Sequence, residues 1–121
     1  MVNKAKVINL LSIILINSFE SIDHNHGYVK IKTIYQHGIN RKLPNIQTKF
    51  SNSLLCIIIE NNGPMIDVNN SERIFLPFYS SKSKERGFGL YIAKKIILEH
   101  GGSLNFDSDY DRTKFIISLP I

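Results

Sequence analysis

The sequence has almost no cysteine: Cys56 is the single one among 121 residues. One cysteine cannot form a disulfide within its own chain, so a scaffold held together by disulfides is excluded. Cys56 stands inside an apolar run, where we expect a small residue packed in the core. So little cysteine is compatible with a reducing compartment, and we expect a cytoplasmic location.

The chain also lacks a long hydrophobic run. The longest candidate, residues 7–16, follows two lysines but contains an asparagine and a serine. It is shorter than the roughly 20 residues that a membrane-spanning helix needs. Its charged start resembles a signal peptide, yet no small-x-small cleavage pattern follows. Several apolar side chains fall on one helical stripe, which favours a core helix over residues 3–22 and no membrane span: Val7, Leu10, Leu11 and Ile14.

Negative charge is scarce relative to positive charge. Fifteen Lys and Arg face ten Asp and Glu, which gives a net charge of +5 and a pI of about 9.4. The excess is spread along the chain, so a generally basic surface is favoured over a nucleic-acid-binding protein, which stays open as an alternative. With 43% apolar and 21% charged residues, residues 1–121 have the size and composition of a single globular domain.

A second cluster of metal ligands is missing around the segment Asp23-His24-Asn25-His26-Gly27. Two histidines and an aspartate close together are compatible with a metal site. Because no further ligand group accompanies them, turn chemistry is the favoured interpretation.

A basic loop that leads through glycines into a helix is what the sequence does contain. Three cations, Lys82, Lys84 and Arg86, come directly before the segment 87–90, which reads Gly-Phe-Gly-Leu. The apolar spacing after it predicts a helix that ends at residues 100–102, His-Gly-Gly. The N–H groups of a helix's first turn have no partner within the helix and attract anions. The segment therefore indicates a phosphate-binding site, or plain loop-to-helix punctuation.

Strands are expected on both sides of this helix. The run Leu54–Ile59 predicts a buried strand that ends in the turn Asn61-Asn62-Gly63-Pro64, and an amide there could meet a base edge. Alternation over Val29–Tyr35 predicts a half-buried, antiparallel partner. Alternating apolar side chains after Thr113 predict a closing strand: Phe115, Ile117 and Leu119.

The order of these blocks resembles the ATP-binding domain of sensor histidine kinases, within the wider GHKL ATPase superfamily. Residues 17–21, NSFES, look like the end of its N box, and ENNGPMI at 60–66 looks like its G1 box. IFLPFYSSK at 74–82 is similar to the F box, and GFGLYIAKKIILEHGG at 87–102 to the G2 box. The long segment between the first two boxes resembles the nitrogen-regulation type of these kinases.

The resemblance implies a Bergerat-type fold. This would be an α/β (α+β) two-layer sandwich, with a mixed β-sheet covered on one face by helices. Residues 1–121 would form this one ATPase domain, truncated at its N-terminus. The resemblance implies that the phosphoacceptor histidine stands on a separate dimerisation domain, which we do not find in this sequence.

The resemblance also implies a function and its residues. The domain would bind Mg-ATP and donate the γ-phosphoryl group to that histidine, from which it passes to a response regulator of nitrogen-regulation type. Asn17 would hold Mg²⁺, with Glu20 in support, and Asn61 would contact the adenine. Phe75 and Phe78 flank Pro77 and would pack the hinge of a mobile lid. The implied cofactor-binding positions are Asn61, Gly63, Ile66, Phe78, Lys82, Lys84, Arg86, Gly87, Phe88, Gly89, Leu90 and Thr113.

Three positions depart from the family's pattern. Ile13 stands where a second asparagine is common, Asn61 where an aspartate usually accepts the adenine amino proton, and Met65 where a second glycine is usual. A neutral acceptor makes a weaker hydrogen bond than a charged one, so adenine binding is expected to be weaker. These departures favour the alternative, a degenerate or truncated nucleotide-binding or adaptor module without catalysis.

Overall fold

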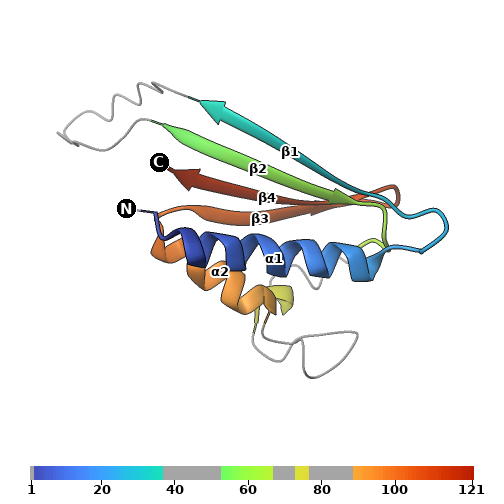
Figure 1. Cartoon of the computed structure of the whole chain (residues 1–121). Coiled ribbons are helices and arrows are strands. Elements are labelled where there is room, and N and C mark those ends of the chain that lie inside the picture. The colour runs from blue at the N-terminus through green and yellow to red at the C-terminus, as the bar shows by residue number, and fades with distance from the viewer. Residues whose placement is uncertain (1, 37–52, 67–72, 77–88) are drawn as a thin grey trace.

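The computed structural model of the chain describes residues 2–36, 53–66, 73–76 and 89–121. The elements in chain order are α1 (Lys4–Ser21), β1 (Val29–Gln36), β2 (Leu54–Asn61), the 3-10 turn η2 (Arg73–Phe75), α2 (Gly89–Glu99), β3 (Ser103–Ser108) and β4 (Thr113–Pro120). Both helices cover one face of a sheet in the order β1-β2-β4-β3 (Figure 1). The predicted two-layer α/β sandwich is confirmed.

The four strands form an antiparallel sheet. β1 pairs with β2, β2 with β4 and β3 with β4, and all three pairings are antiparallel. The expectation of a mixed sheet is therefore wrong for the strands that the structure describes. β1 and β2 are consecutive strands that pair directly, as are β3 and β4, and a parallel pair would instead need a crossover between its strands.

Helix α1 confirms the helix expected over residues 3–22. It begins at a cap, because the side-chain oxygen of Asn3 accepts a hydrogen bond from the Lys6 N–H at 3.1 Å. Leu10 and Ile14 are buried against the sheet, as the stripe predicted. No helix in the described ranges has the length and apolar character needed to cross a membrane.

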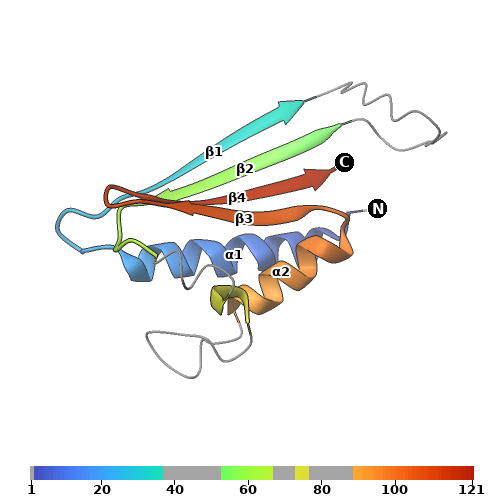
Figure 2. The same cartoon turned by 180° about the vertical axis from the view of Figure 1, so that it is seen from behind.

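Helix α2 ends where the sequence predicted. Gly101 has a φ of 73°, and the Gly102 N–H donates to the Ile97 carbonyl at 2.9 Å. His100 then joins the two helices, because its Nε2 accepts a hydrogen bond from the Asn3 N–H at 3.1 Å. Figure 2 shows the result: α1 and α2 lie side by side on the same face of the sheet.

Strand burial follows distance from the helices. In β4, Phe115, Ile117 and Leu119 are buried, which confirms the closing strand. β1 is less buried than predicted, with Ile31 57% exposed, since it is an edge strand and lies farthest from the helices in both views (Figures 1 and 2).

Two further expectations can be checked in the described ranges. Cys56 is only half-buried and is not a core residue, because it alternates with the buried Ile57 and so faces away from the helices. The segment after α1 is a turn, in which the Asp23 carbonyl accepts the Gly27 N–H at 2.7 Å. In the described part of the chain, no three His, Cys, Asp or Glu side chains lie together in a group that could hold a metal ion.

Candidate functional site

The core has a polar end. Asn61, the last residue of β2, lies directly opposite Thr113, the first residue of β4, and each is only 2% exposed. The next core-facing pair along the same strands is Ile59 and Phe115, both buried. Buried polar side chains need hydrogen-bond partners. The partners of this pair define the candidate site.

Asn61 bonds first to its own turn. Its side-chain oxygen accepts the Gly63 N–H at 2.9 Å, so Asn61 caps the turn that follows β2. A carboxamide oxygen has two lone pairs, and its NH₂ group has two protons. Capping the turn therefore leaves capacity on Asn61 for a base edge, and the adenine contact stays a prediction.

Gly63 lets this turn touch the end of α1. A Cβ atom on Gly63 would lie 2.5 Å from the Ser21 carbonyl oxygen and 2.8 Å from the Ser21 Cβ. Those distances are too short for any larger residue without a shift of the backbone. Gly63 thus joins the turn after β2 to the last turn of α1, and so brings the predicted adenine and metal residues to the same end of the domain.

Thr113 has a hydroxyl partner that the sequence reading missed. Its Oγ1 lies 2.6 Å from the Ser108 Oγ, which also accepts the Ile66 N–H at 2.9 Å. Ser108 therefore connects two predicted site residues. The signal was the alternation of Leu104, Phe106 and Ser108, which puts the serine on the core face of β3.

Asn17 and Glu20 are both half-buried on the last turns of α1. The side chain of Ile13, one turn before Asn17, comes within 3.4 Å of the position of a Cβ on Gly89, the first residue of α2. Residues four apart on a helix share a face. Asn17 is thus on the same side of α1 as the start of α2.

Within the described ranges, packing does not require a glycine at position 89, the first residue of α2. Ile13 is the one neighbour that a Cβ on Gly89 would meet, at an ordinary contact distance of 3.4 Å. Leu90 packs against the core and holds the first turn in place. The N–H groups of that turn have no partner inside the helix, which suits an anion.

Six predicted site residues lie outside the described ranges: Phe78, Lys82, Lys84, Arg86, Gly87 and Phe88. The expected lid is among them. Of the two phenylalanines expected to pack the hinge, Phe75 is described, and its ring lies 6.1 Å from the Phe106 ring on the core. For Phe75, packing onto the core is confirmed.

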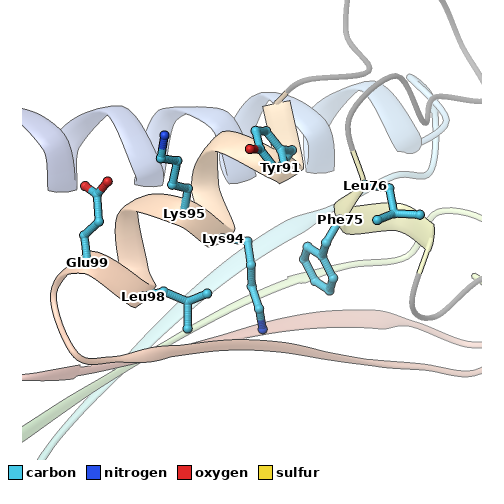
Figure 3. A pocket seen from close by; sticks show the side chains of 7 residues that line it. All are labelled: Phe75, Leu76, Tyr91, Lys94, Lys95, Leu98 and Glu99. Carbon is cyan, nitrogen blue, oxygen red and sulfur yellow. The ribbon is translucent and has the colours of Figure 1, made fainter.

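A groove of about 550 Å³ lies on the outer side of α2 and contains none of the candidate residues (Figure 3). It is lined by Phe75, Leu76, Tyr91, Lys94, Lys95, Leu98 and Glu99. Its Lys94 ammonium donates to the Leu104 carbonyl at 2.7 Å and lies 5.1 Å from the centre of the Phe75 ring. Lys94 is thus already engaged in holding α2 to β3 and η2.

Behind the polar end, on the outer face of the sheet, Glu60 gathers charged and polar groups. The Tyr28 hydroxyl donates to Glu60 at 2.9 Å, and this bond raises the pKa of Tyr28 above its ordinary value. Arg112 and Lys114 each lie 3.8 Å from the same carboxylate. Asn62 accepts the Tyr28 N–H at 2.8 Å. These contacts fix the turn that carries Asn61.

Residues 3–121 match the family described as histidine kinase-, DNA gyrase B-, and HSP90-like ATPase. The chain is 32% identical over 119 residues to the sensory histidine kinase/phosphatase NtrB of Azospirillum brasilense, covering 98% of this chain and 30% of the relative. It is 41% identical to sporulation kinase D of Bacillus subtilis over 66 residues, which cover 54% of this chain and 13% of that one. The chain thus spans about a third of the NtrB relatives' length.

Solved structures show the same fold. The catalytic domain of histidine kinase ThkA, in a nucleotide-free form, matches with a TM-score of 0.76 at 26% identity, over 98% of this chain and 68% of that one. The mycobacterial sensor histidine kinase MprB matches with a TM-score of 0.76 at 20% identity, over 99% and 75% of the two chains.

Proposed function

The chain belongs to the family of histidine kinase-, DNA gyrase B- and HSP90-like ATPases, whose domain binds ATP, and from this premise we propose that it is the catalytic domain of a two-component sensor histidine kinase. In that role it binds Mg-ATP and donates the γ-phosphoryl group to a histidine on a separate dimerisation domain. The enzyme is then a histidine protein kinase.

The observation that carries this proposal is the buried pair Asn61 and Thr113 at the end of β2 and β4. An amide and a hydroxyl at the polar end of the core can form hydrogen bonds with the edge of a base, while apolar side chains cover the faces of the base. Ile66, beside Ser108, supplies such a face. Gly63 keeps the turn close enough to α1 for one ligand to meet both elements.

The phosphates belong at the start of α2. Gly89 and Leu90 supply first-turn N–H groups there, and the preceding basic loop adds positive charge from Lys82, Lys84 and Arg86. Phosphoryl transfer depends mostly on positioning and charge stabilisation, which such groups provide. Gly87, Phe78 and Phe88 complete the proposed binding residues.

The oxygens on α1 fit a magnesium ion. Mg²⁺ prefers oxygen ligands and usually keeps several waters, so the amide oxygen of Asn17 together with nucleotide phosphates would satisfy it. Glu20, three residues later, would orient a metal-bound water. Bound there, the ion neutralises charge on the phosphates. Asn17 would hold the metal, and Glu20 would support it.

The partners follow from the relatives. NtrB is named a sensory histidine kinase/phosphatase. By this likeness we assign the chain to nitrogen regulation, with a response regulator as the final phosphoryl acceptor and a cytoplasmic location. The phosphoacceptor histidine would be supplied in cis or in trans.

Thermal unfolding with nucleotide tests the binding step. A ligand at 100 times its Kd adds about 2.7 kcal/mol, which raises the Tm of a domain of this size by several degrees. We expect a larger shift with ADP and Mg²⁺ than with ADP and a chelator. Asn17→Ala should abolish that difference, whereas Ser12→Ala, on the same helix, should keep it. The proposal is refuted if the protein is well folded and ADP does not change its Tm.

Phosphotransfer tests the enzyme itself. The domain is incubated with labelled ATP and a purified histidine-containing dimerisation domain, and label on the histidine is measured. The alternative is an adaptor that binds nucleotide without catalysis. It is favoured by Ile13, whose apolar side chain lies against the start of α2, where the phosphates would bind. Binding without transfer would support the adaptor, and Ile13→Asn should then increase affinity for ATP.

A further inference from the structure

The buried pair Asn61 and Thr113 has charged neighbours on the other face of the sheet. Successive residues of a strand point to opposite faces, so Glu60, next to Asn61, faces away from the helices. Lys114, next to Thr113, lies directly opposite Glu60 in the register of β2 and β4. Directly behind the two residues proposed to bind the nucleotide, the same two strands therefore carry a pair of opposite charges.

Glu60 is the centre of this outer cluster. Its Oε2 accepts a hydrogen bond from the Tyr28 hydroxyl at 2.9 Å. Its Oε1 lies 3.8 Å from the Lys114 ammonium and 3.8 Å from the Arg112 guanidinium. The Glu60 side chain is only 13% exposed. A carboxylate with so little access to water depends on its protein partners, so these contacts hold Glu60 in one position.

On β4, the contacts of Glu60 lie on both sides of Thr113. Arg112 and Lys114 are the residues before and after this threonine, and both lie near the same carboxylate oxygen. Opposite charges at directly opposed positions of an antiparallel pair stabilise that register. A slip by one residue would turn Thr113 to the outer face of the sheet. Glu60 therefore stabilises the register that places Thr113 opposite the end of β2 on the core face.

On β2, the residues on both sides of Asn61 are tied to one tyrosine. Glu60 precedes Asn61 and accepts the Tyr28 hydroxyl. Asn62 follows Asn61, accepts the Tyr28 N–H at 2.8 Å and donates to the His26 carbonyl at 3.0 Å. Because both neighbours are held, the backbone of Asn61 has little freedom to rotate. The side chain of Asn61 is therefore aimed by contacts on the opposite face of the sheet.

We propose that Glu60 is a positioning residue for nucleotide recognition, which from the outer face of the sheet fixes the orientation in which Asn61 and Thr113 meet the base. The inference rests on the nucleotide binding proposed above and adds a residue that does not touch the nucleotide. Arg112 and Lys114 are 51% and 30% exposed, and ion pairs to such cations add little to stability. The contribution of Glu60 should therefore appear in affinity more than in stability.

The test is Glu60→Ala, measured by calorimetric titration of ADP and IDP, which differ at position 6 of the purine. At a temperature well below the Tm, we expect ADP affinity to fall about fivefold, as for the loss of one neutral hydrogen bond to the base. The preference for ADP over IDP should narrow, because Asn61 is the residue expected to bind the amino group at position 6. A purely structural glutamate would lower the Tm and leave that preference unchanged.

Two milder variants separate the contacts of Glu60. Glu60→Gln keeps an acceptor for the Tyr28 hydroxyl, so it should recover part of the affinity and part of the preference for ADP. Tyr28→Phe removes one hydrogen bond and almost no volume, so it should weaken ADP in the same direction even if Glu60→Ala does not fold. Glu99→Gln is the matched control: it removes the carboxylate of an ion pair to Lys6 at the opposite end of α1 and should leave ADP affinity unchanged.

The inference is overturned if the folded variants of Glu60 and Tyr28 bind ADP like the wild type, or if they weaken ADP and IDP equally. It is also overturned if the wild type binds ADP and IDP equally well, because the base edge is then not read at position 6. A wild type that binds neither nucleotide refutes the proposed function, and this inference falls with it.

Discussion

The two ends of the core are built differently. Toward the middle and the far end, β2 and β4 face the helices with Ile57, Ile59 and Phe115, packed with Leu10 and Ile14 of α1. At the polar end, where β2 ends and β4 begins, the same strands and the same helix carry three buried polar residues: Asn61, Thr113 and Ser18. Apolar packing supplies stability without direction, whereas buried hydrogen-bonding groups cost stability and supply recognition. Substitutions at the two ends should therefore separate folding from binding.

Phe115→Ala should have the largest effect on folding. The side chain is 1% exposed and its ring lies 6.3 Å from that of Phe106. Its removal should lower the free energy of unfolding by about 3–5 kcal/mol, measured by urea denaturation. Nucleotide affinity of the folded fraction should persist.

Two further variants calibrate the Phe115 result. Ile117→Val keeps most of the core volume and should cost about 0.5–1.5 kcal/mol, even if Phe115→Ala proves too unstable to measure. Tyr110→Ala removes a side chain that is 90% exposed and should change stability by less than about 0.5 kcal/mol. A small loss at Phe115 would mean that the apolar end does not carry the fold.

Alanine substitutions at Gly63 and Gly89 compare the two places where a glycine of another segment lies next to α1. Gly63→Ala forces a Cβ to within 2.5 Å of the Ser21 carbonyl oxygen and should destabilise the domain by about 1–3 kcal/mol. Gly89→Ala has room beside Ile13, so its Tm should not fall. If phosphates bind the start of α2, Gly89→Ala should still weaken ADP binding.

The contrast between the two glycines is checked by thermal unfolding and calorimetric titration on the same samples. Equal losses of Tm in both variants would contradict the view that Gly63 is required for packing and Gly89 for binding.

Asn61→Asp sharpens the contrast at a single residue. An aspartate can still accept the Gly63 N–H, and a charged acceptor binds the adenine amino group more strongly. ADP affinity should rise by roughly tenfold, since a charge-assisted bond is about 1.4 kcal/mol stronger. The free energy of unfolding of the empty protein should fall, because a carboxylate replaces an amide that is 2% exposed. Weaker ADP binding at neutral pH would remove Asn61 from the base site.

Local patterns predicted what depends on neighbours in sequence. The helical stripe gave α2, and its ending at Gly101 follows from a backbone with positive φ. The same patterns failed where tertiary position decides. The apolar run predicts a core position for Cys56, but its alternation with Ile57 turns Cys56 to the other face of the sheet. The exposure of β1 depends on which strand lies at the edge of the sheet.

The candidate site divides in the same way. Asn61 and Thr113 were predicted separately, but only the register of β2 and β4 makes them direct neighbours. Ser18 stands four residues after Ile14, so the sequence places it on the core stripe of α1. Its lack of a hydrogen-bond partner depends on tertiary contacts and could not be predicted.

The smallest expected effect concerns the turn that leads into Thr113. The carboxylate of Asp109 accepts the Arg112 N–H at 2.9 Å and the Asp111 N–H at 2.8 Å, and these bonds hold its pKa below the usual value. With the folded-state pKa below the unfolded one, this stabilisation is present above about pH 4 and is lost as the pH falls through the folded-state pKa.

Asp109→Asn keeps a side-chain acceptor but does not titrate, so its Tm should fall less steeply than the wild type's between pH 5 and pH 2. If the Tm of the two proteins changes with pH in parallel, this turn contributes nothing to the pH dependence of stability. A lower ADP affinity of Asp109→Asn at pH 7 would show that the turn, though exposed, also positions Thr113 for binding, and would extend the polar end of the core to the surface loop beside it.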